Sequence, residues 1–157
     1  MAIVQFSSVI PFGRVELFDF LFRDEAWERG IPPEYYCELA ESGPFHEKTN
    51  LKWRLTRYGF SFVFGLRIDR IQASELVVVS QSLGPFDEWI LTQKLSDHGD
   101  SGTKLTDQLE YRLPLGVVGC LFDDLFLRKE VSKLLESRHE KISQLVKALK
   151  SPADKTL

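Results

Sequence analysis

The chain has 157 residues, 43% of them hydrophobic and 12% aromatic, and its formal net charge is -3. A chain of this length is typical of one domain and can bury roughly two-thirds of its unfolded surface. The acidic balance argues against a nucleic-acid-binding protein, which normally carries a basic face.

The sequence shows no sign of export, membrane insertion or a metal site. Residues 1–8 carry neither a basic region nor a long apolar run, and no stretch reaches the ~18 apolar residues of a membrane span. Cys37 and Cys120 are not spaced as a zinc or redox motif, so we expect two reduced, buried thiols. These features indicate a cytoplasmic protein without stable membrane insertion.

The first thirty residues indicate one strand followed by two short helices. Residues 2–8 are rich in strand formers. From Pro11, apolar residues recur at three- and four-residue spacing as far as residue 22, which predicts a helix. A second short helix is expected over residues 24–29, ended by Gly30 and two prolines.

Six further strands are expected next, separated by turn residues. They cover residues 35–40, 51–56, 60–69, 76–79, 86–95 and 103–113. The clearest alternation places Phe60, Phe62, Phe64, Leu66 and Ile68 on one face of a strand. Short connections between successive strands favour an antiparallel meander.

A long amphipathic helix is expected from Val117 to Leu149, after the break at residues 114–116. Unbroken, it would be roughly 50 Å long, so a kink near Gly119 or in the middle is expected. Its apolar stripe, which includes Val118, Leu121, Phe122, Leu125 and Phe126, should lie across a curved sheet. The prediction is an α+β domain of about seven strands over residues 1–150, with a flexible tail at 151–157.

This order of elements resembles the helix-grip fold of the START-type, SRPBCC superfamily, over nearly the whole chain. The segments that carry the resemblance are residues 11–33, the Gly84-Pro85-Phe86 turn with Trp89, residues 102–116 and the long helix. They are most similar to a bacterial branch labelled cyclase/dehydrase or cell-division-inhibitor-like. That branch favours histidines shortly after the tryptophan, where this chain has Leu91 and Gln93. A histidine-based acid–base role therefore does not carry over.

The resemblance implies a cavity between the sheet and the long helix, lined by alternate strand residues. An apolar cavity with a few polar groups is the usual form of a small-molecule site. The polar candidates are Arg57, Gln93, Asp107 and Tyr111. The expected ligand-binding residues are Trp53, Arg57, Phe60, Phe62, Phe64, Trp89, Leu91, Gln93, Leu109, Tyr111, Leu121 and Leu125.

Three functions remain open at this point. The first is binding of a hydrophobic or amphipathic molecule such as a lipid, quinone, isoprenoid or polyketide-like aromatic. The second is a cyclase/dehydrase-type enzyme in which Asp107 removes a proton and Tyr111 or Arg57 stabilises an enolate. The third is an interaction protein with a filled core, for which a homodimer is one form.

A structural interpretation stands beside each of these residues. An inward Asp107 opposite an arginine is more often a structural ion pair than a ligand group. His46, His98 and His139 form no metal-ligand pattern, so no metal or cofactor is expected and all three should be exposed. Arg138 is expected on a solvated, mixed-charge face of the last helix.

Overall fold

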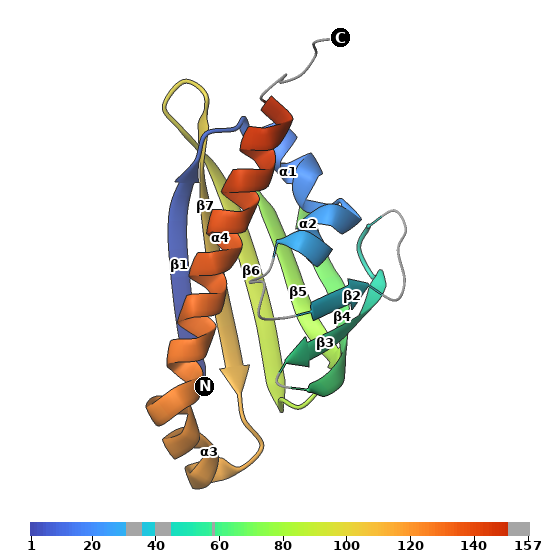
Figure 1. Cartoon of the computed structure of the whole chain (residues 1–157), viewed down its shortest axis with the longest axis vertical. Helices are drawn as coiled ribbons and strands as arrows, with labels where there is room; N and C mark the ends of the chain where they lie inside the picture. The colour runs from blue at the N-terminus through green and yellow to red at the C-terminus, as the bar shows by residue number, and fades with distance from the viewer. Residues whose placement is uncertain (31–35, 40–44, 58, 151–157) are drawn as a thin grey trace.

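The computed structural model describes residues 1–30, 36–39, 45–57 and 59–150, without the side chains of residues 24, 36–39, 57 and 62. Its seven strands form one antiparallel sheet in the order β1-β7-β6-β5-β4-β3-β2 (Figure 1). The strands are β1 (Ala2–Ile10), β2 (Tyr36–Leu39), β3 (Asn50–Arg57), β4 (Phe60–Gln72), β5 (Leu76–Leu83), β6 (Glu88–His98) and β7 (Gly102–Arg112). Two short helices, α1 (Arg14–Leu21) and α2 (Asp24–Arg29), follow β1, as predicted.

The C-terminal helix has three parts. It begins with α3 (Gly116–Phe122), continues through the π-helical segment η1 (Asp123–Leu127), and ends with α4 (Arg128–Lys150). We expected a kink near Gly119 or in the middle of this helix; the irregularity that the structure shows is the π-helical segment at Asp123–Leu127, a feature often found at functional sites. Figure 1 shows α4 running along β1 and β7, whereas α3 extends beyond the end of the sheet.

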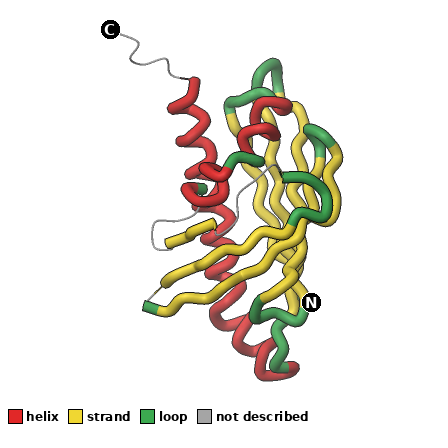
Figure 2. The backbone as a smooth tube through the Cα atoms, turned by 90° about the vertical axis from the view of Figure 1, so that its right-hand side faces the viewer, coloured by secondary structure: helices red, strands yellow, loops and turns green. Residues whose placement is uncertain are grey.

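The sheet curves around the helices rather than lying flat (Figure 2). We call the sheet face covered by α1, α2 and α4 the concave face. On β7, alternate residues from Thr103 to Tyr111 are buried on this face, and on β6 so are Leu91, Gln93 and Leu95. The predicted two-residue alternation is therefore confirmed on both strands. This is the α+β helix-grip arrangement that the sequence predicts.

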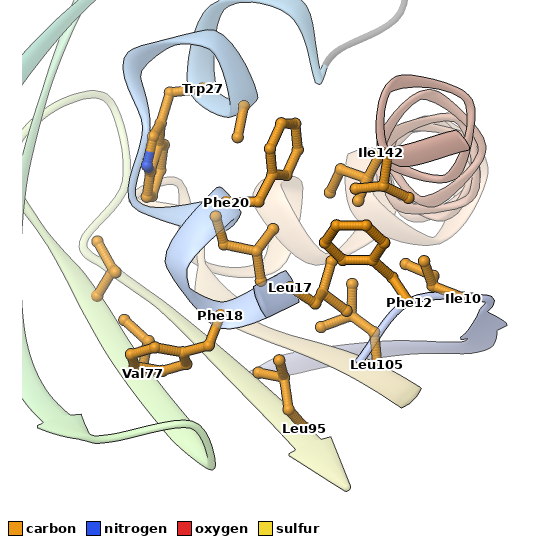
Figure 3. Packing of buried hydrophobic residues seen from close by; sticks show 14 of the residues in the cluster. Ile10, Phe12, Leu17, Phe18, Phe20, Trp27, Val77, Leu95, Leu105 and Ile142 are labelled. Atoms are coloured by element: carbon orange, nitrogen blue, oxygen red, sulfur yellow. The ribbon is translucent and has the colours of Figure 1, made fainter. Parts of the chain in front are cut away.

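The larger core cluster lies where α1 packs into the sheet. Figure 3 shows Leu17 and Phe20 of α1 with residues of the sheet, such as Leu105 of β7, on one side. Ile142 of α4 lies on the other side. Leu17, Leu105 and Ile142 have no exposed surface and Phe20 is 1% exposed. Each such side chain contributes roughly 1.5–3 kcal/mol through its burial. This cluster holds α1 between the sheet and α4.

Two surface features correct the sequence-based expectations. The thiol of Cys120 is exposed and unbonded, because α3 extends past the sheet; Cys37 lies where side chains are not described. Five residues predicted for the stripe that covers the sheet are instead exposed: Val118, Leu121, Phe122, Leu125 and Phe126. No helix of the described segments is long and apolar enough to cross a membrane.

Candidate functional site

Several predicted ligand-binding residues meet on the concave face. The indole of Trp89 lies 5.4 Å from the ring of Phe64, and Phe86 lies 5.8 Å from Tyr111. Trp53, Phe64 and Trp89 pack against the larger core cluster, while Leu91, Leu109 and Tyr111 belong to a second one beside α4. Because Trp53, Phe64, Phe86 and Trp89 are only partly buried, these rings form a half-covered aromatic surface.

Other predicted lining residues lie elsewhere. Phe60, at the β3–β4 turn, is 69% exposed, and Leu121 and Leu125 are exposed on α3 and η1. The side chains of Arg57 and Phe62 lie outside the described residues. The structure thus brings together seven of the twelve predicted residues: Trp53, Phe64, Trp89, Leu91, Gln93, Leu109 and Tyr111.

Asp107 lies at the centre of a buried polar network. Its Oδ1 accepts a hydrogen bond from Gln93 Nε2 at 3.1 Å, as the opposed register of β6 and β7 allows. Its Oδ2 lies 3.5 Å from Arg138 Nε and 3.3 Å from His139 Nε2, both on α4. On the other side of the imidazole, His139 Nδ1 is 2.6 Å from Ser8 Oγ of β1. The network therefore joins three strands to the long helix.

Two expectations about α4 are wrong. Arg138 and His139, which we expected in solvent, are 5% and 2% exposed. The reason is geometric: they lie on the same helical face as the buried residues Leu135 and Ile142, four positions from His139 and Arg138 respectively. The arginine that compensates Asp107 in the described part of the chain is Arg138. The four-residue spacing of Arg138 from the apolar Ile142 was the signal in the sequence that could have placed Arg138 on the buried face of α4.

The charges around Asp107 favour its ionised form. Burial raises the pKa of this carboxyl, but the adjacent His139 and the Arg138 guanidinium, together with Gln93, outweigh burial and hold the pKa below its ordinary value. The carboxylate and the guanidinium thus form a compensated buried ion pair.

Tyr111 belongs to a separate network near the start of the long helix. Its hydroxyl donates a hydrogen bond to Asp123, a buried residue of η1 that also binds Arg128 at 2.9 Å. Burial raises the pKa of the Tyr111 phenol above its usual range, and the Asp123 carboxylate raises it further. This contact fixes the end of β7 to the long helix.

Besides Arg138 Nε and His139 Nε2, which face Asp107 Oδ2, three buried nitrogen donors around Trp27 have no acceptor in the described part of the protein. They are the indole N–H groups of Trp27 and Trp53 and the Nη2 of Arg138. The two indole rings are 5.1 Å apart, and the Arg138 guanidinium carbon lies 5.5 Å from the Trp27 ring centroid. Such groups are costly to leave unpaired, at about 1–3 kcal/mol each. The sequence analysis does not identify Trp27 as a site residue, because it assigns α2 no role beyond forming a short helix.

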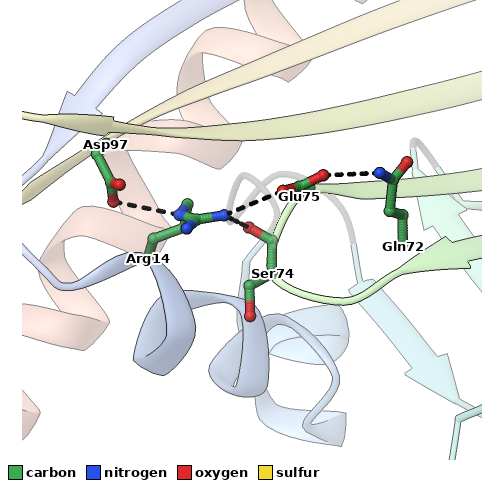
Figure 4. Close-up of polar contacts among 5 residues, drawn as sticks. All are labelled: Arg14, Gln72, Ser74, Glu75 and Asp97. Atoms are coloured by element: carbon green, nitrogen blue, oxygen red, sulfur yellow. Dashed lines mark hydrogen bonds and ion pairs between the residues drawn. The ribbon is translucent and has the colours of Figure 1, made fainter.

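A polar depression of about 750 Å³ lies on the opposite face of the sheet. It is lined by residues such as Gln5, Thr92 and Thr106, which alternate with the buried ones. At one end, Arg14 of α1 binds Asp97 at 3.2 Å and Glu75 at 3.7 Å (Figure 4). These charged groups pair with one another, which is typical of a solvated surface. Among the described residues, no three potential metal ligands come together.

Comparisons with known proteins agree on the fold. No family model and no curated protein matches the sequence. Among solved structures, TTHA0849 from Thermus thermophilus is 18% identical, with a TM-score of 0.71 over 94% of this chain and 99% of that one. A START superfamily protein from Mycobacterium smegmatis is 16% identical, with a TM-score of 0.70 over 94% and 98%. Ara h 8.0201 is also 16% identical, with a TM-score of 0.67 over the same shares. The chain therefore shares the helix-grip fold of these structures.

Proposed function

We propose that this protein binds one hydrophobic or amphipathic small molecule on the concave face, between the sheet and the C-terminal helix. The observation that carries the proposal is the group of buried N–H donors, Trp27, Trp53 and Arg138, beside half-buried aromatic rings. An apolar wall with a few polar groups suits a ligand with an apolar body and one polar end. The START superfamily name of one similar structure agrees with this class of function.

The polar end of the ligand is best a neutral acceptor such as a carbonyl oxygen. Indole and guanidinium groups only donate hydrogen bonds, so they require an acceptor. Asp107 already compensates the charge of Arg138, and a second buried carboxylate would carry a charge without a partner. Quinones and polyketide-like aromatics combine a flat apolar body with carbonyl groups, and lipids or isoprenoids with a carbonyl share this chemistry.

The proposed contact residues are those that the concave face brings together. Trp53, Phe64 and Trp89 would stack on the apolar body, with Leu91 and Leu109 behind them. Gln93 and Tyr111 would act indirectly, since their polar atoms bind Asp107 and Asp123. The exposed Phe60, Leu121 and Leu125 are not part of the proposed site.

The enzyme alternative receives less support from the geometry. As a base, Asp107 would be weak, because its pKa is held low by Arg138 and His139. The Tyr111 hydroxyl donates its hydrogen bond to Asp123, so it is not free to donate to a substrate. Both candidates are therefore assigned structural roles in the proposal.

A matched pair of compounds tests the proposal. A methylnaphthoquinone and the corresponding methylnaphthalene have nearly the same shape, and only the quinone carries acceptor oxygens. At about 100 times its dissociation constant a ligand stabilises the fold by roughly 2.7 kcal/mol, or about 5–10 °C for a chain of this size. We expect the quinone to bind more tightly, as measured by thermal shift and native mass spectrometry. If neither compound, nor any lipid of a wider panel, binds, the proposal is wrong.

Conservative variants locate the site. Trp27→Phe and Trp53→Phe keep an aromatic ring but remove the donor, so each should reduce the preference for the quinone over the hydrocarbon. Trp89→Phe is the control, because the Trp89 N–H is not one of the buried unpaired donors. If the wild type and all three variants prefer the quinone over the hydrocarbon equally, the indole N–H groups do not bind the ligand, although the apolar part of the site still can.

A further inference from the structure

The beginning of the C-terminal helix presents an apolar surface to solvent. Six large apolar side chains of α3 and η1 are 50–79% exposed. They are Val117, Val118, Leu121, Phe122, Leu125 and Phe126. We call them the apolar tip, because Figure 1 shows α3 beyond the end of the sheet. Within the described structure, nothing covers these side chains.

The apolar tip is held in place by the rest of the protein. Asp123 is buried on the opposite side of the helix, where it accepts the Tyr111 hydrogen bond and pairs with Arg128 at 2.9 Å. Gly119 is also buried, and a Cβ at this position would lie 3.1 Å from the Leu113 side chain. The exposed side chains are therefore on a helix that is anchored along its other face. A preorganised surface of this kind loses little entropy on binding.

The size of the apolar tip matches one side of a dimer interface. If a free side chain of this type presents roughly 150–200 Å², the six at their observed exposures present about 570–760 Å². The largest apolar patch of a typical monomer is roughly 300–600 Å². A stable interface buries about 800 Å² on each partner. The apolar tip is thus at or above the upper end of what a typical monomer exposes, and it approaches what a dimer needs.

Its side chains are arranged in two rows with four-residue spacing. One row is Val117, Leu121 and Leu125, and the other is Val118, Phe122 and Phe126. Rows of this spacing form the ridges that pack into the grooves of a second helix. In a two-fold dimer the same surface of each copy contacts the other copy, so the ridges of one apolar tip would pack into the grooves of the second.

The charges favour a protein partner over a lipid surface. Helices that lie on membranes carry lysine and arginine on their polar face. From residue 113 to 127 the only charged residues are Asp123 and Asp124. Asp124 lies 3.6 Å from Arg128, so its charge is compensated and does not oppose a second copy.

We propose that the apolar tip is a homodimer interface, in which α3 and η1 of two copies pack around a two-fold axis. This proposal is independent of the ligand proposal. Two-fold dimers are the commonest soluble oligomers. The two ridges, their area and the absence of lysine and arginine from α3 and η1 all fit such a dimer.

Light scattering coupled to size exclusion tests the proposal on the full chain. We expect a mass of twice 18.1 kDa for the wild type at micromolar concentrations. Val117→Glu and Phe122→Glu place a charge in each ridge and should give monomers. Val117 and Phe122 are exposed, so these variants should keep the wild-type far-ultraviolet circular dichroism. Val15→Glu is the matched control, since Val15 is 58% exposed on α1, and it should remain a dimer.

Cross-linking provides a second readout. The exposed Cys120 lies on α3 beside the row that begins with Val117, so a long, flexible bis-maleimide should give covalent dimers in the wild type and fewer in Phe122→Glu. Cys120→Ser is the control for the reacting thiol. A monomeric wild type at about 100 µM, or dimers that survive both glutamate substitutions, would overturn the proposal. Flotation of a monomeric protein with phosphatidylcholine or phosphatidylglycerol vesicles would assign the surface to a membrane instead.

Discussion

Replacing Arg138 with methionine should destabilise this protein strongly. Arg138 and Asp107 are 5% and 0% exposed, and Arg138 Nε lies 3.5 Å from Asp107 Oδ2. Methionine keeps much of the side-chain volume but leaves the carboxylate with only His139 and Gln93. Removing one partner of a buried pair typically costs about 3–5 kcal/mol. For a chain of this size, we expect the melting temperature to fall by roughly 10 °C or more.

Urea denaturation gives the free energy of unfolding, and a surface pair gives the control. Arg67 and Asp69 are closer, at 2.7 Å, but Arg67 is 55% exposed, so Arg67→Met should cost less than about 1 kcal/mol. In the double variant Asp107→Asn/Arg138→Met, the loss should be smaller than the sum of the single losses by at least about 1 kcal/mol. Additive losses, or an Arg138→Met loss no larger than that of Arg67→Met, would refute the reasoning.

Two further predictions concern the ionisable groups. Tyr111→Phe removes a hydrogen bond to the buried Asp123 carboxylate and should cost about 1.5–3 kcal/mol in urea denaturation; a loss below about 0.5 kcal/mol would mean that the contact is not made. Because the pKa of Tyr111 is raised, its contribution to stability is present below about pH 10 and decreases as the pH rises further. Absorbance titration of the wild type against Tyr111→Phe should therefore show one tyrosine that ionises later than the others. The pKa of Asp107 is lowered, so its contribution is present above its ordinary value of 3.8 and is lost as the pH falls through the lower folded value. Asp107→Asn should therefore lose less stability than the wild type between about pH 4 and 2; equal losses would contradict the assignment.

Most of the fold could be predicted because the strands alternate clearly. Leu91, Gln93 and Leu95 share the buried face of β6, as their spacing indicates. The helix over Asp24–Arg29 was predicted with its observed bounds, since Gly30 ends it. These patterns depend on residues close in the sequence. They predict the structure correctly where the local preference and the packing of the core favour the same conformation.

The candidate site was predictable only in part. Asp107 was identified on the inward face, but its partner lies 31 positions later in the sequence, and the choice among arginines depends on how α4 is rotated against the sheet. The polar character of Arg138 and His139 hid their place on the buried face of the helix. Nor can periodicity show where the sheet ends, so Leu121 and Leu125 were expected on the sheet although α3 extends beyond it.

The indole N–H signals offer the most direct test of the ligand proposal. The chain has three tryptophans, so its nitrogen–proton correlation spectrum contains three indole peaks, which Trp→Phe variants assign. With the methylnaphthoquinone, the peaks of Trp27 and Trp53 should move downfield as their N–H groups gain an acceptor, whereas methylnaphthalene should leave them without that downfield shift. If the quinone shifts none of the three peaks, or only that of Trp89, the buried donors do not bind a ligand oxygen and the central claim is contradicted.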